Sequence, residues 1–207
     1  MKRSVQWSIA VSAVTLVCSL SFAYGDIPVA AWFHALNDAS LFALFSRITL
    51  FGDSLSYLVP GLLLYLVFRS SKPHLAETGR FLFVGVAVSG LGADIIKFIA
   101  GRARPKLYFS DHIYGFSFFR YEPAWISFPS GHAATAFSAA FVLSALFPRW
   151  RILCFALAVL IAFSRIYLSQ HYISDVIAGS FLGMASTALL YNRFFKPKDN
   201  AIEPSQV

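Results

Sequence analysis

The chain has 207 residues, of which 57% are hydrophobic and only 13% are charged, and its formal net charge is +7 at pH 7. A soluble domain carries about 25% charged residues, so this composition excludes an ordinary soluble protein and indicates one embedded in a membrane. The basic residues are scattered between apolar runs and form no stripe with interleaved aromatic side chains. This distribution argues against a nucleic-acid partner.

Six apolar runs are long enough, or nearly long enough, to cross a bilayer as helices. They cover residues 5–23, 55–68, 81–100, 132–147, 152–166 and 173–190. The pattern predicts an all-α, polytopic membrane protein with six transmembrane helices, in which residues 1–207 form a single domain. The first run is expected to be an uncleaved helix rather than a signal peptide, because further apolar spans follow it instead of a soluble domain.

Two segments outside these runs have a different character. Residues 27–51 mix apolar and polar side chains, and Leu41, Phe45 and Ile48 fall at helical spacing. This spacing favours an amphipathic helix lying in the membrane interface, and an ordinary connecting loop with one helical turn is an equal alternative. The polar tail, residues 196–207, is expected to be disordered.

The charges of the connecting loops predict the orientation, because cytoplasmic loops carry an excess of lysine and arginine. One set of alternating loop ends is net positive, and this set includes both termini, which are therefore expected in the cytoplasm. The loop of residues 101–129 falls on the opposite side, although its four basic and two acidic residues also give it a charge of +2. Binding of an anion on that side would explain this violation of the rule.

Three islands of polar residues fall on the same non-cytoplasmic side. The first, at the end of the third run, contains Lys97 and Arg104, which are seven residues apart and would share a face if the helix persists to Pro105. Asp94 lies three residues before Lys97. It is expected either to form an ion pair that fixes Lys97 or to make a purely structural contact between helices.

The second and third islands lie at the starts of the fourth and sixth runs. Ser130 can cap the fourth helix, and the amides of residues 130–132 would then face outward at the positive end of the helix dipole. The third island contains Arg165, His171 and Asp175. Because His171 and Asp175 are four residues apart, they would share one face of a helix, one turn apart.

Together the islands supply three cations, two histidines and one carboxylate. Three converging cations in an apolar setting repel one another unless an anion lies among them, and phosphate has the matching charge and geometry. One histidine can then attack phosphorus while the other protonates the leaving oxygen. Asp175 can accept a hydrogen bond from one ring nitrogen of His171 and leave the other nitrogen free to attack.

This set of residues resembles the type 2 phosphatidic acid phosphatase superfamily over roughly residues 81–190. The matching motifs are Lys97-x6-Arg104-Pro105, Pro129-Ser130-Gly131-His132 and Ser164-Arg165-x5-His171-x3-Asp175. The resemblance implies a core bundle of helices, metal-independent catalysis without a cofactor, and a phosphohistidine formed on His171. His132 would be the general acid and Asp175 would orient His171. The phosphate would be held by Lys97, Arg104, Arg165, Ser130 and the amide of Gly131.

The function that follows is a phosphatase acting on a lipid phosphate in the outer leaflet of a bacterial inner membrane. The candidate substrates are undecaprenyl diphosphate, phosphatidylglycerol phosphate, phosphatidic acid and the phosphate of lipid A, which share the bound group and differ elsewhere. A phosphotransferase with the same phosphohistidine, and a non-catalytic membrane scaffold or transporter, are the alternatives.

Two further interpretations of the same residues are weaker. A metal site built from His132, His171 and Asp175 is disfavoured, because three nearby cations would oppose a divalent ion. A serine hydrolase using Ser130 would be expected to show a Gly-x-Ser-x-Gly elbow, which the sequence lacks. Acyl transfer also has no need of a cluster of cations.

Overall fold

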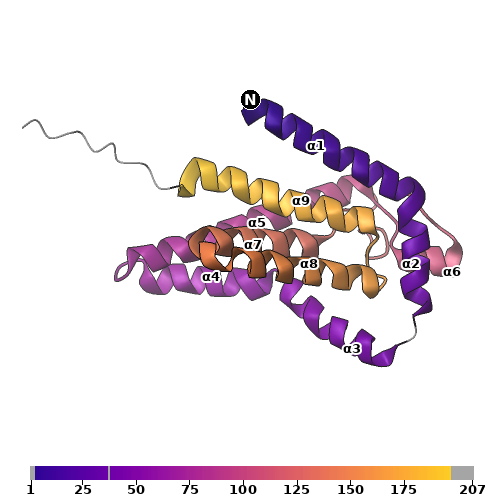
Figure 1. The fold of residues 1–207 in the computed structure, drawn as a ribbon, viewed down its shortest axis with the longest axis horizontal. Helices are drawn as coiled ribbons and strands as arrows, with labels where there is room; N and C mark the ends of the chain where they lie inside the picture. Colours follow the sequence, from indigo (N-terminus) through magenta and orange to yellow (C-terminus); the bar gives the residue numbers. More distant parts are fainter. Residues whose placement is uncertain (1–2, 37, 197–207) are drawn as a thin grey trace, which may run out of the picture.

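The computed structural model describes residues 3–36 and 38–196, and all the regular elements in this part of the chain are helices (Figure 1). The predicted all-α class is therefore confirmed. The elements are α1 (Arg3–Leu20), η1 (Ser21–Gly25), α2 (Asp26–Ala35), α3 (Ala39–Ile48), η2 (Thr49–Gly52), α4 (Leu55–Phe68), α5 (Pro73–Ala100), α6 (Pro105–Asp111), α7 (Gly131–Leu146), η3 (Pro148–Trp150), α8 (Arg151–Tyr167), α9 (Ile173–Leu190) and η4 (Tyr191–Phe195). Residues 197–207, most of the tail predicted to be disordered, lie outside the described residues.

Five helical segments within the described residues are long and apolar enough to cross a membrane. They are Ser4–Ala35, Ala39–Phe68, Pro73–Ala100, Pro148–Tyr167 and Ile173–Phe195. Helix α7 corresponds to the remaining predicted span, but it is a shorter apolar helix of 16 residues. Five candidate spans are thus observed, and the sixth crossing remains a prediction.

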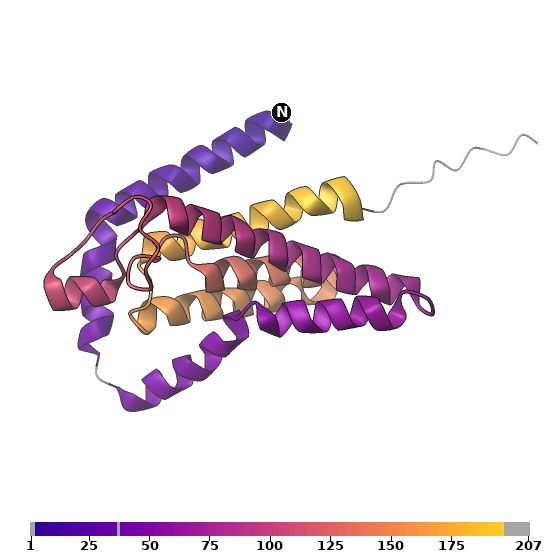
Figure 2. The ribbon, with the colours of Figure 1, turned by 180° about the vertical axis from the view of Figure 1, so that it is seen from behind.

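The segment between the first two apolar runs is mostly helical, which confirms the helical part of its prediction. Helices α2 and α3 turn away from the long axis of the bundle at one end of the molecule (Figure 2). Asp38 caps α3 by accepting hydrogen bonds from the amides of Ser40 and Leu41. Through η2, α3 continues into the region of α4, so it belongs to the same long apolar segment. The location of α3 in the membrane interface remains a prediction.

Helix α7 lies at the centre of the bundle and packs against α5, α8 and α9, while α4 pairs with α5 and α1 packs along α9 (Figure 1). The first residues of α1 and the last turn of α9 lie towards the end of the bundle that carries the α4–α5 connection. Helix α6 and the loops before α7 and α9 lie at the opposite end (Figures 1 and 2).

Small side chains allow α7 and α9 to approach closely. A methyl group added at Gly183 of α9 would lie only 2.1 Å from the carbonyl oxygen of Ala134 in α7, and one at Gly179 would lie 2.3 Å from that of Ser130. A hydrogen bond of 2.7 Å joins the hydroxyls of Ser138 and Thr187 across the same interface. Close approach of small residues with polar bonds between helices is how membrane helices associate when both are surrounded by lipid.

Large apolar side chains cover the outside of the bundle. Leu16, Val67, Leu91 and Ile152, from four different helices, are 60%, 65%, 64% and 85% exposed. Such a surface would favour aggregation in water, whereas lipid tails solvate it. The chain is therefore an integral membrane protein.

The close approach of α7 and α9 makes a testable prediction. Gly183→Ala should destabilise the protein by about 1–3 kcal/mol, because the new methyl group collides with backbone atoms that cannot rotate away. The measurement is the Tm of the detergent-solubilised protein. Gly90→Ala is the matched control, since a methyl group at Gly90 of α5 meets no atom within 4 Å. Equal Tm values for the two variants would show that the helices separate at no cost.

Candidate active site

The predicted site residues come from separate elements that meet at one end of the bundle. Lys97 lies in the last turn of α5, Arg104 precedes α6, residues 130–132 begin α7, Arg165 lies in the last turn of α8, and residues 171–175 lead into α9. The segments are tied together at this end, because the Ser130 amide donates a hydrogen bond of 2.9 Å to the carbonyl oxygen of Asp175. Segments far apart in sequence therefore face one region.

His171 is held by a backbone carbonyl group. Its Nδ1 lies 2.7 Å from the carbonyl oxygen of Ser127 and 3.6 Å from Oδ2 of Asp175. The second distance is too long for a hydrogen bond, so the direct bond predicted between His171 and Asp175 is not formed. Because both neighbours of Nδ1 are acceptors, we assign its proton to Nδ1, which leaves the lone pair on Nε2.

The two residues also do not share a helix face, contrary to the sequence prediction. Helix α9 begins at Ile173, so His171 lies in the turn before it and only Asp175 lies in the first helical turn. The amide of His171 donates instead to the carbonyl of Arg165, at 3.2 Å, at the end of α8. The connection between two helices, rather than one helical face, thus brings His171 and Asp175 together.

The surroundings of His171 favour its neutral form. The side chain is buried, and burial lowers the pKa of His171 to about 4, with the positive charges of Arg104 and Arg165 acting in the same direction. The nearby carboxylate of Asp175 opposes this shift without reversing it. A histidine that stays neutral at physiological pH retains the lone pair that a nucleophile needs.

Asp175 is fully buried and accepts hydrogen bonds from three groups, none of which is its neighbour His171. These are Nη1 of Arg102, the Ser127 hydroxyl at 2.6 Å and the Tyr172 amide at 2.8 Å. The sequence prediction missed Arg102 and Ser127. Arg102 is one of the four basic residues of the loop 101–129, and outside the motif of Arg104 nothing in the sequence distinguishes it from Lys106 and Arg120.

Arg104 and Arg165 each retain unused donor capacity. Arg104 Nη1 contacts Gln170, and Arg165 Nη1 donates a hydrogen bond of 2.7 Å to the Thr49 hydroxyl. The Nε groups of both arginines are buried and have no hydrogen-bond partner among residues 3–36 and 38–196. Buried donors of this kind are rare without an acceptor, so they fit a site for an anion.

The end of α5 differs from the prediction. The helix stops at Ala100 because Gly101 adopts a left-handed conformation with a φ of 55°, and a methyl group there would lie 1.9 Å from the Ser117 carbonyl oxygen. Arg104 follows in an extended segment and precedes Pro105, the first residue of α6. Lys97 and Arg104 therefore do not share a helix face, and a turn of the backbone, not a longer helix, places Arg104 in the site.

Lys97 lies between an acidic partner and the start of α7. Its ammonium group is 2.9 Å from the Asp94 carboxylate, which is the ion pair that the sequence suggested. A methyl group at Gly131 would lie 3.0 Å from the Lys97 Nζ. The absence of a side chain at residue 131 thus lets the cation approach the amide end of the helix.

Ser130 caps α7, as predicted, by accepting a hydrogen bond from the amide of Ala133 at 3.4 Å. Because its own amide donates to Asp175, only its hydroxyl proton remains for a ligand. In the described part of the chain, the amides of Gly131 and His132 have no acceptor. These two amides lie at the positive end of the helix dipole, where an anion is stabilised.

The short helix η2 forms a wall of the site that sequence reasoning did not identify. A methyl group at Gly52 would lie 2.7 Å from Cδ2 of His132, so a side chain there would displace the imidazole. Three residues earlier, Thr49 holds Arg165. Within residues 3–36 and 38–196, no group of three His, Cys, Asp or Glu side chains is placed to hold a metal ion.

Comparison with known proteins agrees with this arrangement. The model of the PAP2 superfamily matches residues 78–199. The chain is 34% identical over 211 residues to a lipid A 1-phosphatase of Rhizobium etli, an alignment that covers 91% of this chain and 87% of the relative. It is 30% identical over 126 residues to an undecaprenyl-diphosphatase of Sulfolobus acidocaldarius, covering 60% of this chain and 57% of that protein.

The fold also has a counterpart among solved structures. A crystal structure of a transmembrane PAP2-type phosphatidylglycerolphosphate phosphatase from Bacillus subtilis aligns with a TM-score of 0.67 at 22% identity, over 91% of this chain and 98% of that one. At this identity the likeness shows the fold alone. With the family model matching more than half of the chain, the sequence and the fold lead to one conclusion. The chain belongs to the PAP2 superfamily, in its branch of membrane lipid-phosphate phosphatases.

Proposed function

We propose that this protein hydrolyses a phosphate on a membrane lipid through a phosphohistidine at His171, without a metal ion. The observation that carries the proposal is the hydrogen bond between Nδ1 of His171 and the Ser127 carbonyl, which leaves Nε2 as the free nucleophile. The unpartnered donors of Arg104 and Arg165, within the described residues, support a phosphate as the bound group.

In the proposed mechanism, Nε2 of His171 forms a bond to phosphorus while the bond from phosphorus to the lipid oxygen breaks. His132 gives its proton to that oxygen. Lys97, Arg104 and Arg165 stabilise the equatorial oxygens, where negative charge gathers in the transition state. A water molecule, deprotonated by His132, then attacks the phosphorus of the phosphohistidine. The bond from phosphorus to Nε2 breaks, inorganic phosphate is released and neutral His171 is regenerated.

For the substrate, we propose the 1-phosphate of lipid A, because the lipid A 1-phosphatase of Rhizobium etli is alignable over most of both chains. Undecaprenyl diphosphate is the second candidate, supported by the shorter alignment with the undecaprenyl-diphosphatase of Sulfolobus acidocaldarius. We propose that both termini lie in the cytoplasm and that the site opens at the opposite face, in the periplasm or exterior. The first residues of α1 and the last turn of α9 lie towards one end of the bundle and the candidate site lies at the other, which supports this orientation (Figure 1).

The chemistry makes the first prediction about activity. In EDTA, the purified protein should release inorganic phosphate from lipid A or from another lipid phosphate in a panel. His171→Ala should reduce kcat by at least about 10³-fold, because the attacking nitrogen is lost. The measurement is phosphate release in detergent micelles.

The matched control is His74→Ala, since His74 is exposed near the start of α5, away from the candidate site, and should be dispensable. A requirement for a metal ion, or full activity in His171→Ala, would contradict the mechanism. Transfer of phosphate to a second lipid without release would identify a phosphotransferase, and no turnover of any lipid phosphate would favour a non-catalytic scaffold.

The protonation state of His171 makes a second prediction. Because burial and two cations favour the neutral ring, His171 should stay neutral as the pH falls through its ordinary pKa of about 6.5 and become protonated only near pH 4. Titration of the histidine ring signals by NMR measures this value, with the His171 signal identified by its absence in His171→Ala. A midpoint near the ordinary value would show that the site does not favour the neutral nucleophile.

The orientation is testable by chemical labelling. In a background with Cys18→Ala and Cys154→Ala, single cysteines are introduced as Glu122→Cys, in the loop before α7, and Lys72→Cys, between α4 and α5. A membrane-impermeant maleimide added to intact bacterial cells should label the first and not the second, because the loops lie on opposite sides. The reverse pattern would place the candidate site in the cytoplasm.

A further inference from the structure

A buried network of charges joins the N-terminal helices to the candidate site. Asp26, Arg102 and Asp175 are 1%, 0% and 0% exposed. Arg102 donates to Asp26 through Nη2 at 2.7 Å and to Asp175 through Nη1. Two carboxylates therefore share one guanidinium out of contact with water, where removal of one partner leaves a charge uncompensated.

Asp26 also holds the first turn of α9 directly. Its Oδ1 accepts a hydrogen bond of 3.0 Å from the amide of Ser174, and its Oδ2 accepts one from the Ser174 hydroxyl. That hydroxyl in turn accepts a bond of 2.7 Å from Arg102. Ser174 precedes Asp175 in the chain, so a carboxylate from α2 fixes the position of the turn that carries Asp175.

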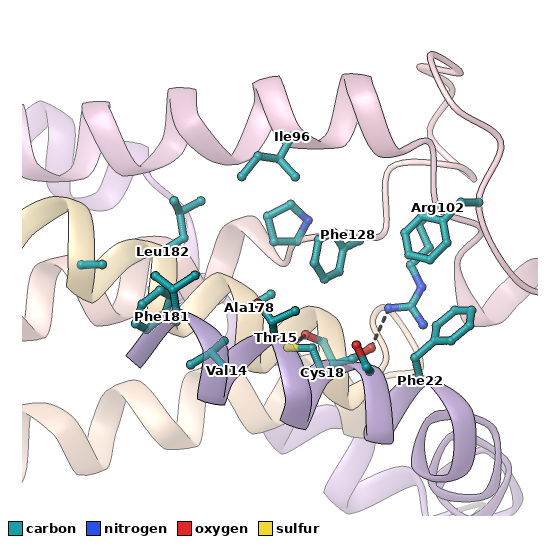
Figure 3. A pocket seen from close by; sticks show the side chains of 16 residues that line it. Val14, Thr15, Cys18, Phe22, Ile96, Arg102, Phe128, Ala178, Phe181 and Leu182 are labelled. Atoms are coloured by element: carbon teal, nitrogen blue, oxygen red, sulfur yellow. Dashed lines mark hydrogen bonds between the residues drawn. The ribbon is translucent and has the colours of Figure 1, made fainter. Parts of the chain in front are cut away.

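The surroundings of Arg102 are apolar and aromatic. Figure 3 shows Arg102 at one end of an apolar cavity of about 530 Å³ bordered by α1 and α9. The guanidinium lies 4.7–5.9 Å from the ring centroids of Tyr172, Phe22, Phe116, Tyr114 and Phe128. Aromatic faces stabilise a cation without supplying an anionic partner, so Arg102 depends on its two carboxylates for charge balance.

We propose that Asp26 is a positioning residue for the proposed reaction, which orients Asp175 and His171 through Arg102 and Ser174. The PAP2 family model matches only residues 78–199, so Asp26 lies in a part of the chain that this model does not include. Asp26, at the start of α2, thus connects the N-terminal part of the chain to the candidate site. The inference rests on the proposed function, because it assigns Asp26 to the same site.

The contacts of Asp26 specify which kinetic constant should change. Lys97, Arg104 and Arg165, which hold the phosphate in the proposed mechanism, make no hydrogen bond or ion pair with Asp26 in the described structure. Removing the Asp26 charge therefore leaves phosphate binding intact. It weakens the hydrogen bonds that hold the turn at Ser174, and it leaves Arg102 with one carboxylate. Nε2 of His171 is then no longer correctly oriented toward phosphorus.

The experiment compares Asp26→Asn with Asp38→Asn in the full chain, using whichever lipid phosphate the wild-type protein hydrolyses. Asp26→Asn should lower kcat about tenfold or more, since small displacements of a catalytic group are costly. The KM and the inhibition constant of inorganic phosphate should stay within about twofold of the wild-type values. Asp38→Asn makes the same chemical change at an exposed residue, where asparagine still caps α3, and should change none of these constants.

Ser174→Ala provides a second variant, because it removes only the hydroxyl between Asp26 and Arg102 and keeps both charges. It should lower kcat by a smaller factor than Asp26→Asn, with KM unchanged. The Tm of each variant is measured alongside to test folding. If Asp26→Asn does not fold, the kcat of Ser174→Ala decides whether the positioning role holds.

The outcomes separate the inference from the function on which it rests. A wild-type protein that hydrolyses no lipid phosphate overturns the proposed function itself. If the wild-type protein is active, either of two results for the variants overturns the positioning role of Asp26. One is that a folded Asp26→Asn keeps its kcat within about twofold, or that Ser174→Ala does so where Asp26→Asn is unfolded. The other is that kcat and phosphate binding are lost together with a lowered Tm, because Asp26 then serves folding alone.

Discussion

The candidate site depends on the burial of one carboxylate, that of Asp175. A fully buried charge is costly unless donors surround it, and here Arg102, Ser127 and the Tyr172 amide supply them. These groups come from three different segments, so satisfying one carboxylate fixes their mutual positions. The Ser127 carbonyl then holds His171 in the orientation that exposes Nε2. The orientation of His171, the proposed nucleophile, thus follows from the charge balance of Asp175, a residue that makes no hydrogen bond to it.

Helix packing brings the other half of the site to this carboxylate. Gly179 and Gly183 let α9 approach the backbone of α7, and the amide of Ser130 reaches the carbonyl of Asp175 as a result. At the start of α7, the absence of a side chain at Gly131 lets the ammonium group of Lys97 in α5 approach. Small residues in this bundle therefore do more than allow the helices to associate, because they set the distance between the start of α7 and the turn that carries His171, the proposed nucleophile.

The apolar surroundings of the candidate site strengthen the electrostatic interactions of its few polar groups. Burial lowers the pKa of His171, and the buried Nε groups of Arg104 and Arg165 have no hydrogen-bond partner among the described residues. A phosphate that enters this region gains interactions that are stronger than in water. At the same time, cations at the edge of an apolar bundle need such a partner. The substrate is thus proposed to complete the charge balance that the protein leaves open.

Much of the fold was predictable from the sequence, because lipid imposes strong local rules. Apolar runs of sufficient length must be helical, and two predicted runs, 55–68 and 173–190, agree with α4 and α9 to the residue. Ser130 at the start of α7 was predictable for a similar reason, since capping is a local interaction. The motif residues were predicted as a set because their types match the chemistry of phosphate and because their spacing resembles that of a known family.

Other features were decided only by the tertiary structure. The partner of Nδ1 in His171 is a backbone carbonyl, which no residue type reveals. Helix α5 ends at Ala100 because Gly101 adopts a left-handed conformation, and the Ser117 carbonyl leaves no room there for a side chain. Asp26 and Arg102 are 76 residues apart, and nothing in the sequence indicates that they form an ion pair. The sequence by itself determined the helices, the membrane and the phosphate chemistry, because these follow from local composition and residue type. Only the folded chain decided which buried charges neutralise one another, because that depends on contacts between distant segments.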